Sequence, residues 1–259
     1  MRSVPHDAGR RVVVIGASNV ARNSALIVET IRRSAPEPAE ILIAAGHGRS
    51  YGLSTCVVGR RLSSIGACNL WRAWAARSSL PTSAVVTDVG NDVMYGVPVD
   101  VILAWVARCL ERFADAGAAT TLTSLPLAGV LRLNPLAFYA LRTVLFPFHR
   151  ADFATVVDRA RRLDDGLRES ADRYRARLVE PRPEWYGLDP IHLRRRSASR
   201  AWREILVPTS WSDVEIAASW SLRVASLRWI ADERRLFGCA QRRPQPIATF
   251  ADGTTLSMY

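Results

Sequence analysis

Short strand-like runs alternate with amphipathic stretches along most of this chain, and that alternation most constrains how it folds. The runs, mostly aliphatic or threonine, cover 11–15, 41–45, 84–87, 120–123 and 177–179. Apolar residues at helical spacing predict helices at 20–34, 70–77, 98–114 and 152–175. Apolar strands separated by helices form a parallel sheet that is covered on both faces. The sequence therefore predicts an α/β protein, a three-layer α/β/α sandwich with a central parallel sheet, as in flavodoxin-like folds.

Two segments stand outside this alternation. Residues 125–150 form an insertion rich in leucine and aromatic side chains, between an expected strand and an expected helix. Such an insertion at the carboxyl end of a strand often forms a lid or pocket wall, and an extra helix packed on the core is the alternative. Residues 211–259 form a C-terminal extension, in which we expect a helix at 214–234 and a hairpin at 247–259 that turns at 251–253. The 259 residues fit a single domain.

The basic residues exclude several large enzyme classes. All 35 are arginine, so the chain has no lysine for a phosphate-binding loop, a pyridoxal-phosphate Schiff base or kinase catalysis. The net charge of +11 would attract polyanions. The arginines are scattered in pairs, however, which favours a solvated surface over a specific nucleic-acid groove. A weak contact with anionic membranes stays open.

Cysteine usage and the N-terminus bear on location. The four cysteines are far apart and lack metal-ligand spacing, so we expect reduced packing residues and no metal site; they are Cys56, Cys68, Cys109 and Cys239. The first residues lack the charged and apolar segments of a signal peptide, and no apolar run reaches the ~18 residues of a membrane span. The prediction is a cytoplasmic protein.

Chemically useful residues follow the ends of several expected strands. In an open parallel sheet the ligand crevice lies beyond the carboxyl ends of the strands. Ser18 follows Gly16 after the first strand, and the loop after the second strand runs from Gly46 to Gly52. Asn91 follows the third strand, and the segment from Asp189 to His192 follows the last. Each signal alone is weak, because a serine at the start of a helix is more often a cap than a nucleophile.

Taken together and in this order, these residues resemble the sequence blocks of the SGNH/GDSL hydrolase family. Gly90-Asn91-Asp92 and Asp189-x-x-His192-Leu193 match two blocks closely, whereas the usual Gly-Asp-Ser is here Gly16-Ala17-Ser18. The resemblance extends from the first strand to about residue 206 and implies ester or thioester cleavage through an acyl-enzyme, without a metal or organic cofactor.

The resemblance also implies roles for individual residues. Ser18 would be the nucleophile, His192 the general base and acid, and Asp189 the carboxylate that orients the imidazole. A serine hydroxyl needs such an oriented base in order to attack a carbonyl carbon. The oxyanion hole would comprise the N–H groups of Ser18 and Gly48 and the side-chain amide of Asn91.

The substrate expected from this interpretation is a small-molecule ester with an apolar acyl group. Candidate pocket residues come from the second loop and from the insertion, namely His47, Arg49, Tyr51, Phe138 and Leu145. The oligomeric state stays open.

Three other functions compete with the hydrolase. An acyltransferase would use the same triad with an alcohol in place of water. A Rossmann-type NAD(P)-binding dehydrogenase would explain the first strand and its glycine, but the glycine pattern is incomplete and the catalytic Tyr-x-x-x-Lys pair is absent. A non-enzymatic anion-binding module is the third alternative.

Overall fold

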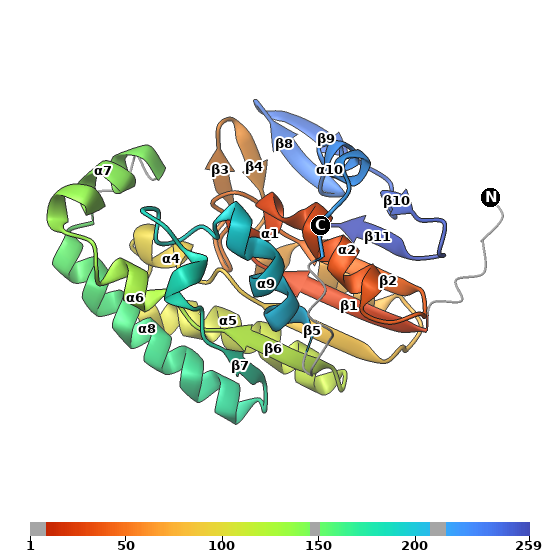
Figure 1. Cartoon of the computed structure of the whole chain (residues 1–259), viewed down its shortest axis with the longest axis horizontal. Coiled ribbons are helices and arrows are strands. Elements are labelled where there is room, and N and C mark those ends of the chain that lie inside the picture. Colours follow the sequence, from red (N-terminus) through yellow and green to blue (C-terminus); the bar gives the residue numbers. More distant parts are fainter. Residues whose placement is uncertain (1–8, 146–150, 208–215) are drawn as a thin grey trace.

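A mixed, mostly parallel sheet forms the centre of the molecule, and a computed structural model describes residues 9–145, 151–207 and 216–259. Seven strands lie in the order β10-β11-β2-β1-β5-β6-β7 (Figure 1). Their bounds are β1 Arg10–Ile15, β2 Ala39–Ala44, β5 Thr82–Val86, β6 Ala119–Thr123, β7 Arg177–Val179, β10 Ala248–Thr249 and β11 Thr255–Met258. Only the pairing of β10 with β11 is antiparallel. The predicted α/β fold class is confirmed.

Helices cover both faces of this sheet, and β1 shows why. Val13 and Ile15 pack in one apolar cluster with α5 (Val99–Asp115) and α8 (Phe153–Arg173). Val12 and Val14, which point the other way, pack with α2 (Ser24–Arg33) and α9 (Arg195–Leu206). Because both faces of β1 are buried, its unbroken aliphatic run is the pattern that a central parallel strand requires.

The described part of the predicted insertion, residues 125–145, is mainly helical, and residues 146–150 lie outside the described residues. It contains α6 (Leu127–Val130) and α7 (Pro135–Leu145), and Figure 1 shows α7 beyond the end of the sheet, beside the start of α8. The side chain of Asp152 caps α8 by accepting a hydrogen bond from the N–H of Thr155 at 2.9 Å. Three further helices are short: α1 (Ser18–Arg22), α3 (Leu70–Ala75) and α4 (Asn91–Met94). No helix in the described part of the chain is long and apolar enough to cross a bilayer.

The C-terminal extension is built into the central sheet. The predicted hairpin is present, since β10 and β11 pair around a turn at 251–253, and β11 also runs parallel to β2. Residues 214 and 215 of the predicted helix at 214–234 lie outside the described residues, and over 216–234 the prediction is mostly wrong, because α10 covers only Trp220–Ser226. The chain leaves the helix before β8 (Glu233–Leu236) because β8 pairs with β4 (Arg60–Leu62).

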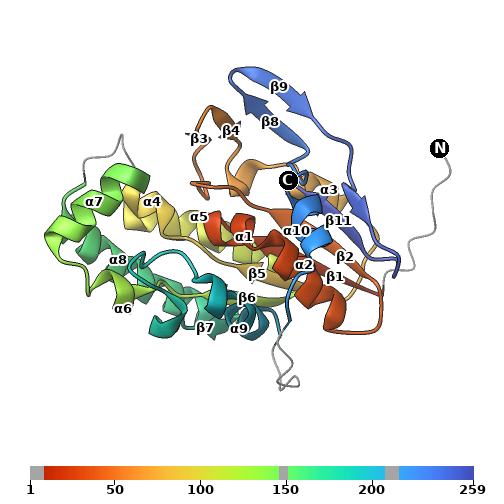
Figure 2. The same ribbon diagram turned by 45° about the horizontal axis from the view of Figure 1, so that its top comes forward.

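A second, four-stranded antiparallel sheet was not expected. Its order is β3-β4-β8-β9, with β3 at Thr55–Val57 and β9 at Cys239–Arg242, and it projects from the sandwich as two adjoining hairpins (Figure 2). All four cysteines are free. Cys68 and Cys109 are buried, as expected of packing residues, but Cys56 and Cys239 are exposed because they lie in these thin hairpins.

Candidate active site

Ser18 lies at the turn from β1 into α1, at the carboxyl edge of the sheet. The turn passes through Gly16, where a Cβ atom would come within 2.6 Å of the Val20 side chain and 2.9 Å of the Thr87 side chain. Only glycine therefore fits this close approach. Ser18 is the first residue of α1, is 8% exposed and lines a cavity. Its hydroxyl is thus held near the N-terminus of a short helix at the mouth of that cavity.

The structure brings Ser18, His192 and Asp189 together from opposite ends of the chain. His192 Nε2 lies 3.0 Å from Ser18 Oγ, and His192 Nδ1 lies 2.6 Å from Asp189 Oδ2. A carboxylate on Nδ1 favours the tautomer with its proton there, which leaves Nε2 free to accept the serine proton. This is the geometry of an activated serine nucleophile.

The Asp189 carboxylate is held by its own loop. Its Oδ1 accepts hydrogen bonds from the backbone N–H groups of Ile191 at 3.1 Å and His192 at 3.2 Å. Burial by itself would raise the pKa of Asp189, but the hydrogen bonds from the His192 side chain and from these amides outweigh it and leave the pKa below its ordinary value. The carboxylate therefore stays ionised opposite the imidazole at neutral pH.

The three N–H donors expected to bind an oxyanion make at most one long hydrogen bond within the described residues. Within the described chain, no hydrogen bond involves the backbone N–H of Ser18 or of Gly48. Gly48 has a φ of +63°, a conformation that glycine adopts without strain. Asn91 lines the same cavity as Ser18, and its side-chain amide makes only a long contact of 3.4 Å with the Arg49 carbonyl. These groups are available to a ligand.

Buried Asp92 ties the loop of Gly48 to the loop of Asn91. Its Oδ2 accepts a hydrogen bond from the backbone N–H of Tyr51 at 3.0 Å, whereas Oδ1 is buried and has no hydrogen-bond partner among the residues that the structure describes. Burial raises the pKa of Asp92 to about 6, although hydrogen bonds from the Ser50 side chain and the Tyr51 amide act in the opposite direction.

Asp88 is a site residue that sequence reasoning missed. It follows β5 with a φ of +59°, and its Oδ2 accepts the N–H groups of Ala17, Asn19 and Val20 at 3.1, 2.8 and 3.3 Å. A carboxylate at the N-terminus of a helix satisfies its unpaired amides and interacts favourably with the helix dipole. Asp88 thus engages the amides on either side of Ser18 N–H and leaves that one donor open.

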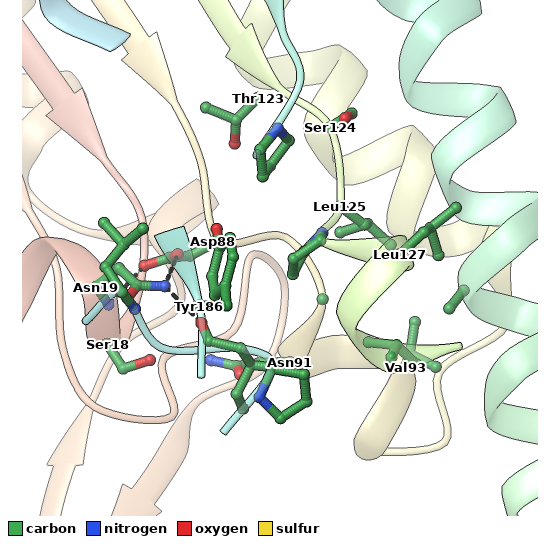
Figure 3. A pocket seen from close by; sticks show the side chains of 18 of the residues that line it. Ser18, Asn19, Asp88, Asn91, Val93, Thr123, Ser124, Leu125, Leu127 and Tyr186 are labelled. Atoms are coloured by element: carbon green, nitrogen blue, oxygen red, sulfur yellow. Dashed lines mark hydrogen bonds between the residues drawn. The ribbon is translucent and has the colours of Figure 1, made fainter. Parts of the chain in front are cut away.

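Asn19 extends this contact to the loop of His192 (Figure 3). Its Nδ2 donates to Asp88 Oδ1 and to the Ile191 carbonyl, both at 2.8 Å, and its Oδ1 accepts the N–H of Leu193 at 2.9 Å. One amide side chain therefore joins the helix of Ser18 to the residues on both sides of His192. The signal in the sequence was a charged residue directly after a buried strand and a second polar residue after Ser18.

A predominantly apolar cavity leads away from Ser18 past the ends of β5 and β6 (Figure 3). The insertion forms much of its wall through Leu127, Val130, Leu133, Phe138 and Leu141. Phe138 lines the cavity as predicted and also packs in the core, since its ring centroid lies 5.1 Å from that of Phe153. The two interpretations of the insertion are thus compatible. The side chain of Leu145 lies outside the described part of the structure.

Three other predicted pocket residues do not line this cavity. Arg49 is buried because it donates hydrogen bonds to the carbonyls of Ala45, Ser63 and Tyr259, which ties the loop to the C-terminus. The Tyr51 hydroxyl donates to the Thr87 carbonyl at 2.7 Å, inside the core. These two placements correct the prediction, because both side chains turn inward and not toward a ligand.

The third of these residues, His47, does not line the cavity either, and its side chain is exposed. The pKa of His47 is lowered, mainly by partial burial of its ring and also by the positive charges of Arg60 and Arg22.

Comparison with known proteins finds solved structures that are similar to this chain. No protein-family model and no curated protein matches the chain. One solved chain has a TM-score of 0.53 at 13% identity, over 77% of this chain and 96% of its own. A second is TesA, which is 16% identical over 76% of this chain and 96% of its own, with a TM-score of 0.48. A third is AlinE4, a SGNH-hydrolase family esterase, which is 18% identical over 77% of this chain and 98% of its own, with a TM-score of 0.42. The likeness to the first of these chains, with its TM-score of 0.53, concerns the fold alone.

Proposed function

We propose that this protein is a serine hydrolase that cleaves carboxylic esters or thioesters with an apolar acyl group. The observation that carries the proposal is the hydrogen-bonded chain from Asp189 through His192 to Ser18, situated at the mouth of an apolar cavity. The SGNH-hydrolase esterase among the similar structures supports it.

The first half of the reaction forms an acyl-enzyme. Ser18 Oγ attacks the carbonyl carbon of the ester while His192 Nε2 takes the hydroxyl proton. The negative oxygen of the tetrahedral intermediate accepts hydrogen bonds from Ser18 N–H, Gly48 N–H and the Asn91 amide, and each such donor contributes about 3 kcal/mol to transition-state stabilisation. The bond to the leaving alcohol or thiol then breaks, and that group takes the proton from His192.

The second half returns the enzyme to its starting state. A water molecule attacks the acyl carbon, His192 Nε2 accepts a proton from that water, and Ser18 leaves with the proton to regenerate its hydroxyl. Throughout both halves Asp189 remains ionised and stabilises the imidazolium. The acyl chain occupies the cavity lined by the insertion, where its apolar surface is removed from water.

A fluorophosphonate probe tests this proposal directly, because it reacts only with an activated serine. We expect stoichiometric labelling of the full chain and a modified peptide that contains Ser18, located by mass spectrometry. The matched control is Ser18→Ala, which removes one oxygen atom and should fold as the parent does. Labelling of another serine at the same rate in both proteins would contradict the proposal.

A further inference from the structure

Two hairpin turns of the small sheet meet at its outer end. The turn between β3 and β4 is Val58-Gly59, and the turn between β8 and β9 is Phe237-Gly238. The N–H of Phe237 donates to the Gly59 carbonyl at 2.8 Å, and the Phe237 ring occupies the space beside Gly59 where a Cβ atom would lie. We call these four residues the hairpin tip. The tip stands at the end of a sheet that projects from the sandwich (Figure 2).

The hairpin tip carries apolar side chains where backbone geometry disfavours them. Val58 has a φ of +49° and Phe237 a φ of +46°, and each precedes a glycine that also has positive φ. Turns of this kind favour asparagine, aspartate or glycine, and a β-branched or bulky residue there is strained. Burial of the side chains does not offset this backbone strain, because Val58 is 87% exposed and Phe237 is 77% exposed. Folding stability therefore does not account for these two side chains, and strain retained in this way points to a function.

Two uncompensated positive charges lie directly behind the tip. Arg61 and Arg235 are cross-strand partners on β4 and β8, and both are exposed. Like charges in that position repel each other, and neither arginine forms an ion pair within the described residues. Together with Phe237, Gly59, Gly238 and Cys56 they line a shallow hollow. An anionic group bound in this hollow would relieve the repulsion and be held by two guanidinium groups.

The surroundings of the hollow strengthen its positive potential. The two hairpins also carry Arg60, Arg234, Arg242 and Arg243, whereas Glu233 and the adjoining Asp232 are the acidic residues of this segment. Asp232 accepts a hydrogen bond from Asn69, and Glu233 pairs with Arg242 at 3.2 Å. The acidic residues thus leave Arg61 and Arg235 uncompensated.

We propose that the hairpin tip docks on an anionic lipid bilayer. Val58 and Phe237 enter the boundary between headgroups and acyl chains, and Arg61 and Arg235 bind headgroup phosphates behind them. Binding at a membrane interface strengthens with the apolar area that is buried and with electrostatic attraction to anionic lipids, and the tip with its two arginines supplies both. A nucleic acid would use the arginines and could stack on Phe237, but it offers no apolar phase for Val58.

The small sheet lies next to the loop that carries Gly48, a candidate oxyanion-hole residue. A Cβ atom at Gly48 would come within 2.7 Å of the Val57 side chain, so β3 packs against the loop that holds His47 and Gly48. Docking through the tip therefore places the candidate active site beside the membrane surface, where esters with apolar acyl groups partition. The inference goes beyond the proposed hydrolase function and does not depend on it, because binding is measured without turnover.

Sedimentation with lipid vesicles tests the proposal on the full chain. The vesicles contain phosphatidylcholine alone or phosphatidylcholine mixed with phosphatidylglycerol, and the expected result is binding to the anionic mixture only. The double variant Arg61→Gln/Arg235→Gln should weaken that binding by roughly 30-fold, about fivefold for each arginine. Its matched control is Arg161→Gln/Arg162→Gln, the same charge change at two exposed arginines on α8. Equal losses in both pairs would show a general charge effect and overturn the site.

The apolar contribution is tested with Val58→Asn/Phe237→Asn. Asparagine suits positive φ, so this variant should keep or raise its melting temperature while it loses at least tenfold in affinity for anionic vesicles. The matched control is Leu227→Asn, at an 82% exposed leucine outside the two hairpins. Unchanged vesicle binding of the tip variant would overturn the proposal. So would a duplex DNA probe that binds as tightly as the vesicles and responds only to the arginine variant, because that result would assign the hollow to nucleic acid.

Discussion

Leu133→Asn should separate an acyl-binding wall from a purely structural helix. Leu133 lies between α6 and α7, is half-buried and lines the cavity. Leu136 lies on α7, is 82% exposed and is absent from the cavity wall, so Leu136→Asn is the same chemical change outside the cavity. We expect Leu133→Asn to impair cleavage of long-chain esters and to spare acetyl esters, and Leu136→Asn to leave both unchanged.

The magnitude follows from the apolar contact that the leucine side chain provides. A leucine side chain covers two or three methylene groups of an extended chain, and each buried methylene contributes about 0.8 kcal/mol. The loss is therefore roughly 1.6–2.4 kcal/mol, which corresponds to about 15- to 60-fold in kcat/KM for the long chain relative to acetyl. Phe138 is less suitable for this test, because it is 5% exposed and also packs in the core.

The assay is kcat/KM across a chain-length series of p-nitrophenyl esters, with the melting temperature of each variant measured in parallel. A loss that grows with chain length at an unchanged melting temperature is the expected result. A uniform loss on every ester with a lowered melting temperature would mean that Leu133 only supports the fold. An unchanged series would remove the cavity from the acyl-binding role.

The remaining predictions concern the polar residues of the site. His192→Ala and Asp189→Asn should each lower kcat, and His192→Ala should lower it by roughly 10⁴-fold or more. These losses should not add to the loss caused by Ser18→Ala, because the three residues act as a unit. Additive losses in kcat would contradict this. Asp88→Asn places an NH₂ group against amide donors and costs roughly 2–3 kcal/mol in lost hydrogen bonding. The kcat and the rate of fluorophosphonate labelling should therefore fall together while KM stays unchanged. A lowered melting temperature with an unchanged labelling rate would contradict a positioning role. Asp92 has a folded pKa of about 6 against an ordinary 3.8, so protonation favours the folded state. The stability of the parent relative to Asp92→Asn should therefore rise by up to about 3 kcal/mol as the pH falls from about 7 to 4, and a flat difference in urea unfolding would refute this.

Local pattern was enough to predict the elements that occupy the core. The aliphatic run before Ser18 is buried on both faces, and such a run identifies a central parallel strand without knowledge of its partners. Since parallel strands share one carboxyl edge, the same pattern placed Ser18 and His192 at one edge of the sheet. The resemblance to the SGNH/GDSL hydrolases is what paired these two residues, which are 174 positions apart.

The small sheet could not be predicted because its strands carry no apolar alternation. The strand β8 reads Glu-Arg-Arg-Leu and β9 reads Cys-Ala-Gln-Arg, so neither has a face that must be buried. The two hairpins join into one sheet through pairing between β4 and β8, whose partners Arg61 and Arg235 are 174 positions apart, and such pairing leaves no local signal. The prediction of a helix at 214–234 did not anticipate β8 because the pairing of β8 with β4 leaves no local signal either.

The sequence by itself determined the strand–helix alternation, the carboxyl edge of the sheet and which polar residues follow each strand, because burial periodicity and turn chemistry act over a few neighbouring residues. Only the tertiary structure decided how those residues are used. Arg49 turned inward because β11 brought the Tyr259 carbonyl beside it, and Asp88 became the partner of the Ser18 helix because β5 lies next to β1. A polar side chain binds whichever unsatisfied group packing places within hydrogen-bond distance, and that group is set by contacts between distant segments of the chain.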